Sequence, residues 1–387
     1  MNFFVLSLIK AAVVAFILLT TLAYLQWVER KVIAHIQVRL GPSRVGPHGL
    51  LQPLADVIKL ITKEDLIPPH VNKFVYLLAP FLAVTMALIS ISVIPFGTEI
   101  QVFGHPTWMQ LTDLNVGVLF VLAITSMGVY GVALAGWASN NKYSLLGGLR
   151  SSAQMISYEL PLSLAIAGPL LLANTLSLRH IVEKQAGSIL HWNVLPQIVA
   201  FFVFLIAGFA ETNRVPFDLP EAENELVAGF HTEYSSMKFA AFFMAEYANM
   251  VTMACITTTL FLGGWYPLFP VAWGSNYVPA AIFAAGAALA FYHGFHPARK
   301  RDRLTLPVVG LVFLAIAILF LLPPAQNALI PLFWFLAKVG AILFLFIWVR
   351  GTLPRFRYDQ LMRFAWKVLF PIALANLLVT SLVVALS

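Results

Sequence analysis

The chain has 387 residues, of which 60% are hydrophobic and only 11% are Asp, Glu, Lys or Arg, and its mean hydropathy is +0.85. Because soluble domains carry about 25% charged residues, this composition excludes a water-soluble globular protein and indicates a membrane protein with several spans. The formal net charge of +7 requires no nucleic-acid partner, since basic loops on one side of a membrane, in contact with anionic lipid, explain it.

Apolar runs of about 20 residues predict an all-α, polytopic fold. The first run carries its charges too late for a cleaved secretory signal, so it is expected to remain as a helix. Residues 1–387 are expected to form a single transmembrane domain. Ten spans are expected, at residues 3–28, 73–95, 114–137, 154–173, 194–211, 238–263, 278–294, 305–322, 328–349 and 364–386.

The distribution of Lys and Arg among the loops predicts the orientation of the chain. With the N-terminus outside, the inner loops and their helix edges hold twenty of the 24 Lys and Arg residues. The outer loops hold only Arg179 and Lys184. Because short basic loops stay in the cytoplasm, both termini are expected on the periplasmic side.

The first inner loop, residues 29–72, is expected to contain a shaped turn followed by an amphipathic helix. The glycines and prolines of GPSRVGPHG prevent a continuous helix. In the sequence that follows, Leu54, Val57 and Ile61 fall on one helical face, whereas Asp56 and Lys59 fall on another. This pattern is typical of a helix in the membrane interface. It fits either an ordinary surface anchor or a functional surface.

The second inner loop, residues 210–238, contains an unusual group of acidic residues close to a membrane helix. Mutual repulsion and desolvation raise the pKa of crowded carboxylates, so such groups can take up and release protons near neutral pH. A solvated acidic loop is the alternative interpretation. His231 and Tyr234 could hand protons to a reduced substrate, or serve only as loop contacts. The acidic residues are Glu211, Asp218, Glu221, Glu223, Glu225 and Glu233.

The decisive polar residues within the expected spans are Glu159, Glu246 and Lys338, with Glu211 at the inner end of its span. Burying such groups in hydrocarbon is costly, so they usually face a polar interior and mark proton or ion paths. The alternative for Glu159 and Glu246 is a neutral acid that forms a hydrogen bond between helices.

Other common kinds of site are not expected in this chain. Its one cysteine, Cys255, can form neither an internal disulfide nor an iron–sulfur cluster. No nucleotide-binding loop or paired-His metal motif is present, so no metal site is expected. His293 and His296 have a suitable spacing but no third ligand nearby, which favours a role at the membrane interface.

Four segments resemble the H-subunit of NADH-quinone oxidoreductase, the membrane subunit beneath the peripheral arm of respiratory complex I. The resemblance covers residues 3–267 and 328–387. Residues 268–327 depart from it and are expected to be an inserted pair of helices. The four segments are WVERKVIAHIQVRLGPSRVGPHGLLQPLADVIKLITKED, GWASNNKYSLLGGLRSSAQMISYE, AETNRVPFDLPEAENELVAGFHTEYSSMKFAAFFMAEY and RGTLPRFRYDQLMRFAWKVLFP.

The resemblance implies a subunit of a proton-translocating enzyme in the bacterial inner membrane, with quinone as substrate and no catalysis by the isolated chain. It places iron–sulfur clusters and flavin only in partner subunits, with peripheral, quinone-facing subunits and small membrane subunits as neighbours. The implied proton path is Glu159, Glu211 and Glu246. The implied quinone chamber consists of Arg30, Lys31, Arg39, Asp56, Lys59, Asp218, Glu221, Glu223, Glu225, His231 and Tyr234.

Two other classes of protein fit part of the pattern. A homologous membrane-anchor subunit of a membrane-bound hydrogenase or ferredoxin-linked complex would share the fold without reducing quinone. The complete GPSRVGP element and PRFRYDQLMR favour the quinone enzyme. A stand-alone ion transporter would more typically show an inverted repeat, which the sequence lacks.

Overall fold

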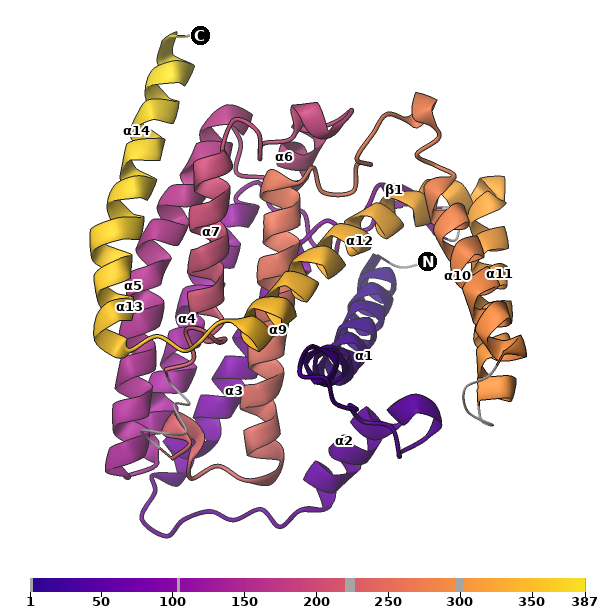
Figure 1. Cartoon of the computed structure of the whole chain (residues 1–387). Coiled ribbons are helices and arrows are strands. Elements are labelled where there is room, and N and C mark those ends of the chain that lie inside the picture. The colour runs from indigo at the N-terminus through magenta and orange to yellow at the C-terminus, as the bar shows by residue number, and fades with distance from the viewer. Residues whose placement is uncertain (1–2, 103–104, 220–226, 297–301, 387) are drawn as a thin grey trace.

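The chain folds as a bundle of membrane-length helices, which confirms the expected all-α polytopic class (Figure 1). The computed structural model describes residues 3–102, 105–219, 227–296 and 302–386. Within these ranges, nine helices are long and apolar enough to cross a membrane. The remaining expected span is α7 (Ile198–Glu211), an apolar helix of 14 residues.

Helix α9 (Ser236–Phe261) lies at the centre of the main bundle and packs against α3, α7 and α12. In the most apolar stretch of α9, 61% of the residues are buried. The corresponding share is 17% in α1 and in the C-terminal helix, so α9 is the candidate span least exposed to lipid. The other main helices are α1 (Phe3–Ile36), α3 (Lys73–Ser90), α4 (Gly117–Ala138), α5 (Lys142–Ala173), α12 (Pro323–Thr352) and α14 (Phe370–Leu386).

Small residues let the backbones of α4 and α5 approach closely. A Cβ atom on Gly136 would lie 2.6 Å from the carbonyl oxygen of Ser144 and 3.1 Å from the Cα of Gly148. Lipid surrounds helices with an apolar medium, so helices in a bilayer associate through close packing rather than through a hydrophobic driving force. Gly136 therefore fixes the α4–α5 contact that positions the polar residues farther along α5.

Two helices extend well beyond the ends predicted from the sequence. Helix α1 continues to Ile36 rather than ending near residue 28, so Glu29, Arg30 and Lys31 are helical and not part of a loop. Helix α5 begins at Lys142 rather than residue 154, because Asn141 caps it by accepting a hydrogen bond from the Tyr143 amide. In both cases a helix extends past the apolar run into polar sequence, and in α1 this extension carries Glu29 and Arg30, which form ion pairs.

The connecting segments contain structure that the apolar pattern did not predict. Strands β1 (Glu99–Val102) and β2 (His105–Trp108) pair antiparallel, with Glu99 opposite Trp108. A short helix, α6 (Leu178–Lys184), lies at the same end of the bundle in Figure 1. Helix α13 (Tyr358–Phe364) leads through a π-helical turn into α14.

The predicted amphipathic helix is α2 (Gln52–Thr62), which lies across one end of the bundle in Figure 1. Its apolar residues Leu54, Val57, Ile58 and Ile61 are 44–60% exposed, so no other part of the described chain covers this face. A face of this kind suits the lipid boundary. We call the α2 end of the bundle the inner end and the opposite end the outer end.

Residues 268–327 contain helices α10 (Val278–Phe295) and α11 (Asp302–Leu321), which stand to one side of the bundle (Figure 1). A small core of Ala280, Phe320, Ile330 and Trp334 joins them to the first half of α12. At the inner end, His48 Nε2 lies 3.3 Å from Asp302 Oδ1. That these helices form an insertion relative to the family stays a prediction.

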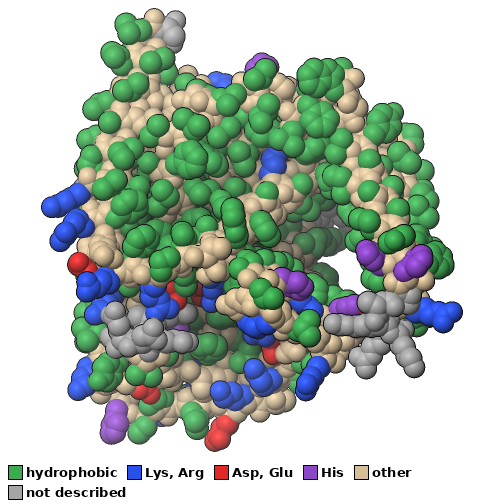
Figure 2. Space-filling model, viewed as in Figure 1, with side chains coloured by type: hydrophobic (Ala, Val, Ile, Leu, Met, Phe, Trp, Pro, Cys, Tyr) green, Lys and Arg blue, Asp and Glu red, His purple; other side chains and the backbone are tan. Residues whose placement is uncertain are grey.

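Most of the visible Lys and Arg side chains lie in the lower, inner part of the molecule in Figure 2. The two outer-loop cations have local partners. Arg179 pairs with Asp113 at 3.0 Å and with Glu183 at 3.3 Å, and Lys184 donates to the carbonyl of Ala173. The orientation with both termini outside stays a prediction.

The α4–α5 contact predicts opposite effects for two glycine substitutions on the same helix. Gly136→Ala should lower the melting temperature of the detergent-extracted protein, because its Cβ meets backbone atoms and overpacking costs about 1–3 kcal/mol. Gly128→Ala should leave the melting temperature equal or higher, since its Cβ meets nothing within 4 Å and Ala favours helix. Equal melting temperatures for the two variants would contradict this account.

Candidate functional site

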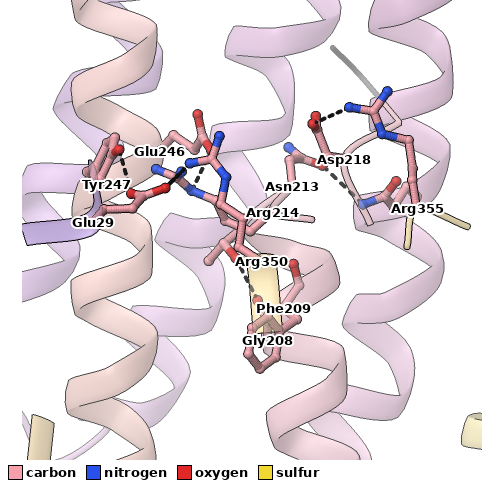
Figure 3. Close-up of polar contacts among 12 residues, drawn as sticks. Glu29, Gly208, Phe209, Asn213, Arg214, Asp218, Glu246, Tyr247, Arg350 and Arg355 are labelled. Atoms are coloured by element: carbon pink, nitrogen blue, oxygen red, sulfur yellow. Dashed lines mark hydrogen bonds and ion pairs between the residues drawn. The ribbon is translucent and has the colours of Figure 1, made fainter. Parts of the chain in front are cut away.

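A cluster of buried charged residues lies where α1, α9, α12 and the segment after α7 meet (Figure 3). Both Glu29 and Arg214 in it are only 3% exposed. Because isolated buried charges are very costly, such groups persist only when they are paired and hydrogen-bonded. The ion-pair cluster consists of Glu29, Arg214, Glu246, Tyr247 and Arg350.

Glu29 is the acceptor at the centre of the ion-pair cluster. Its Oε2 accepts a hydrogen bond of 2.7 Å from the Tyr247 hydroxyl. Its Oε1 lies 3.3 Å from Arg214 Nη1 and also accepts from Arg350 Nη1. One carboxylate from α1 thereby joins a tyrosine of α9, an arginine of α12 and the segment after α7.

Arg214 bridges two carboxylates on different helices. Besides contacting Glu29, its Nε lies 2.7 Å from Glu246 Oε1, and its guanidinium lies 4.0 Å from the centre of the Tyr247 ring. Burial acts to lower the pKa of Arg214, but Glu246, Tyr247 and Glu29 together raise it above its ordinary value. Arg214 therefore stays charged, and two arginines balance two glutamates when both carboxylates are ionised.

The end of α7 explains how Arg214 reaches the interior. Asn213 adopts a left-handed conformation with φ of 51°, which Asn tolerates better than most residues. The Asn213 amide donates to the Ala210 carbonyl and the Arg214 amide to that of Phe209. Gln154 of α5 secures this turn by donating 2.8 Å hydrogen bonds to the carbonyls of Ala210 and Phe217. The helix thus ends in a turn that directs Arg214 inward.

A wide cavity of about 450 Å³ opens on one side of the ion-pair cluster. It combines charged groups with apolar walls, which is the combination that binds an amphipathic small molecule. Its lining residues are Gln26, Glu29, Arg30, Ile33, Gln37, Arg39, Val215, Phe243, Tyr247, Arg350 and Gly351.

A narrow cavity of about 50 Å³ lies on the other side of the cluster. Since a buried water needs roughly 10–15 Å³ of open volume and polar partners, this cavity has room for a few water molecules. Its polar lining residues are Glu211, Thr212, Asn213, His231, Glu246 and Asn249. Phe243 lines both cavities, so one side chain separates them at this point.

Several residues predicted for the quinone chamber lie together at the wide cavity. Arg30 and Arg39 line it, and Arg30 Nη1 forms a 2.9 Å ion pair with Asp56 Oδ2 of α2. Lys59 lies 3.9 Å from Asp56 but is 69% exposed. Lys31 points elsewhere, with its ammonium 5.8 Å from the Trp27 ring.

The residues predicted for the proton path lie around the narrow cavity. Glu211 and Glu246 line it, together with His231. Glu159 of α5 accepts a hydrogen bond from Ser126 of α4, and its charge acts on Glu211. Glu211 and Glu246 therefore share a cavity and Glu159 acts on Glu211, while the part of all three carboxylates in proton transfer stays a prediction.

The remaining predicted residues lie apart from these two linings. The Tyr234 hydroxyl donates to the carbonyl of Tyr76, and the two rings stack 4.2 Å apart. Burial raises the pKa of Tyr234 above its ordinary value, so its hydroxyl stays protonated. Asp218 pairs with Arg355 at 2.8 Å. Glu221, Glu223 and Glu225 lie outside the described residues.

Sequence reasoning did not select Glu29, Arg214, Tyr247 or Arg350, although each stands within a quoted segment. Tyr247 and Arg350 are 218 and 321 positions away from Glu29, so no local pattern could pair them. One signal in the sequence could have indicated these residues. Placing any charge beside a membrane helix costs free energy, and this cost applies to Arg214 and Arg350 as much as to the carboxylates.

Comparisons with known proteins agree over almost the whole chain. The NADH dehydrogenase family matches residues 9–381. An H-subunit of the NADH-quinone oxidoreductase of Solibacter usitatus is 71% identical, over 99% of this chain and 98% of that relative. An H-subunit of the same enzyme in Koribacter versatilis is 53% identical over the same shares. The H-subunit from Protochlamydia amoebophila is 47% identical, over 94% of this chain and 92% of its own.

The charge balance of the ion-pair cluster predicts that a double substitution is better tolerated than a single one. Arg214→Met leaves the buried Glu29 and the partly buried Glu246 with one arginine and should destabilise the protein by about 3–5 kcal/mol. Adding Glu246→Gln removes the unpaired charge and should recover part of that loss. Thermal unfolding of the extracted complexes measures both, and a double variant less stable than Arg214→Met would contradict the pairing.

Proposed function

The chain belongs to the NADH dehydrogenase family, as a membrane subunit of NADH-quinone oxidoreductase, and from this membership we propose that its two cavities link quinone reduction to proton transfer. The wide cavity would face the quinone, and the narrow cavity would begin the carboxylate path. The observation that carries the proposal is the bridge formed by Arg214, which contacts Glu29 at the wide cavity and Glu246 at the narrow one.

The lining of the wide cavity suits a quinone headgroup and the start of its isoprenoid tail. Quinone oxygens accept hydrogen bonds, and Arg30, Arg39 and Arg350 supply donors. Ile33, Val215 and Phe243 supply apolar wall. The Arg30–Asp56 ion pair holds the polar face of α2 at this cavity, so α2 has a role beyond anchoring the chain.

Reduction of the quinone changes the charge beside Glu29. Two electrons, supplied by an iron–sulfur cluster of a partner subunit, convert the quinone into a dianion that takes up two protons and leaves as quinol. The developing negative charge attracts Arg350, which lines the wide cavity, away from Glu29, and Glu29 then relies more strongly on its contact with Arg214. Any loss of the Arg214 contact changes the charge balance at Glu246 and shifts the protonation equilibrium in the narrow cavity.

The narrow cavity would pass this change to Glu211 and Glu159. Water in the cavity can connect Glu246 to Glu211 and His231, which line it together. Glu159 of α5 accepts a hydrogen bond from Ser126 of α4, and both side chains are only partly buried. Small membrane subunits of the complex would continue the path there.

The assembled complex supplies what this chain lacks. Peripheral subunits would close the wide cavity from the cytoplasmic side and carry the clusters and flavin, and lipid would cover α2. We place both termini in the periplasm of a bacterial cell, with the chain in the inner membrane. Glu221, Glu223 and Glu225 are included in the proposed quinone chamber only because of the family resemblance. The relatives' names favour the quinone enzyme over a hydrogenase-type complex or a stand-alone transporter.

Glu29→Gln tests the proposed function in membranes that contain the assembled complex. Losing a charge-assisted hydrogen bond costs about 1.5–3 kcal/mol, so NADH-driven quinone reduction should fall by about 10- to 100-fold. Electron transfer from NADH to a hydrophilic artificial acceptor, which bypasses the quinone, should stay unchanged.

Glu64→Gln is the matched control, because Glu64 is an exposed inner-end glutamate outside both cavities. It should retain quinone reduction. Equal quinone reduction in the Glu29→Gln and wild-type membranes would overturn the proposed role of the ion-pair cluster.

A further inference from the structure

Lys338 lies within the membrane-spanning part of α12 and is only 7% exposed. Its ammonium donates hydrogen bonds to the carbonyls of Leu262, Gly264 and Tyr266, at 2.6, 2.9 and 2.6 Å. It also lies 4.2 Å from the centre of the Trp192 ring. A neutral amine has only two N–H groups, so three donated bonds require the charged form.

None of these four partners is a carboxylate. The charge of Lys338 is therefore compensated by dipoles. The three carbonyls follow the C-terminal end of α9, where the helix dipole places partial negative charge. The aromatic face of Trp192 adds a cation–π contact. Lys338 therefore joins α12 to the turn at the outer end of α9 through three hydrogen bonds at one atom.

The turn after α9 is shaped for this contact. Gly263 and Gly264 have φ of 69° and 52°, and a Cβ on Gly263 would lie 2.3 Å from Trp192 Nε1. Only glycine adopts such conformations without strain and leaves room for the indole. The two glycines thus place carbonyls on either side of the ammonium.

A second polar contact joins the middle of α9 to the inner end of α12. Tyr247 of α9 and Arg350 of α12 both bind Glu29. At a rise of about 1.5 Å per residue, Tyr247 lies about 21 Å along α9 from its last residue, and Arg350 lies about 18 Å along α12 from Lys338. The two helices are therefore fastened at two points separated by similar lengths.

We infer that Lys338 is a positioning residue, which fixes the register of α12 against α9 so that Arg350 and Tyr247 meet at Glu29. Without the outer fastening, α12 keeps only close packing and the Glu29 contact against α9, so its position along α9 is less strictly defined. Arg350 then loses its place at the wide cavity. Only the consequence for quinone reduction rests on the proposed function, since the helix register is a property of this chain.

Hydrogen–deuterium exchange in the intact complex tests the register directly. Lys338→Met should speed amide exchange at residues 262–266 and also at the inner end of α12, where the Leu353 amide donates to Val349 and the Phe356 amide to Pro216. Lys338→Arg keeps the charge and several donors and should restore protection at both places. Faster exchange at residues 262–266 alone would overturn the inference, because it would show a purely local contact.

Two further variants keep the test interpretable. Lys338→Gln retains two N–H donors and replaces Lys338→Met if that variant does not assemble, with the same pattern expected at smaller amplitude. Lys10→Met is the matched control, since Lys10 is also a membrane lysine bonded to a carbonyl, that of Trp108. It should leave exchange at residues 349–356 unchanged, and an equal effect there would also overturn the inference.

Quinone kinetics then separate the inference from the proposed function. The inference predicts that Lys338→Met raises the quinone KM more than it lowers kcat, with artificial-acceptor activity intact and with recovery in Lys338→Arg. If exchange increases at the inner end of α12 while quinone kinetics stay unchanged, the positioning role stands and the proposed quinone role of the wide cavity fails.

Discussion

The bridge of Arg214 between Glu29 and Glu246 is the interaction on which the rest of the site depends. Arg214 keeps its charge although it is buried, and its contacts stabilise Glu29 and Glu246 as anions. Each carboxylate loses this stabilisation if its contact with Arg214 breaks. One guanidinium can serve both because its nitrogen donors form a planar fork. Two cavities with different linings thereby share one arginine. Under the proposed function, a change of charge in the wide cavity therefore shifts the protonation equilibrium in the narrow cavity.

The bundle provides the rigid frame that such a charge balance needs. Gly136 brings α4 and α5 into close contact, Gln154 holds the turn that directs Arg214 inward, and Lys338 fastens α9 to α12. Each contact uses backbone groups, which rotamer changes do not displace. Two other features lie outside this frame and suit contact with lipid. They are the exposed apolar face of α2 and the pair α10 and α11, which stands to one side of the bundle.

Local patterns in the sequence predicted the features that depend on local physics. The apolar runs predicted the spans, the stripe of Leu54, Val57 and Ile61 predicted α2, and the cost of a buried charge selected Glu211 and Glu246. Pairing across the fold could not be predicted, because Glu29 and Tyr247 lie 218 positions apart. The partners of Lys338 are backbone carbonyls, which residue types do not reveal, and its contact with the end of α9 emerged only from the structure.

Infrared difference spectroscopy of the intact complex, recorded on quinone reduction, tests most directly whether charge passes through Arg214. A carboxyl band assigned to Glu211 by its loss in Glu211→Gln should appear in the wild type and weaken in Arg214→Lys. Lysine keeps the charge but lacks the fork that reaches both carboxylates. An unchanged band in Arg214→Lys would show that the narrow cavity responds by another route and would contradict the account.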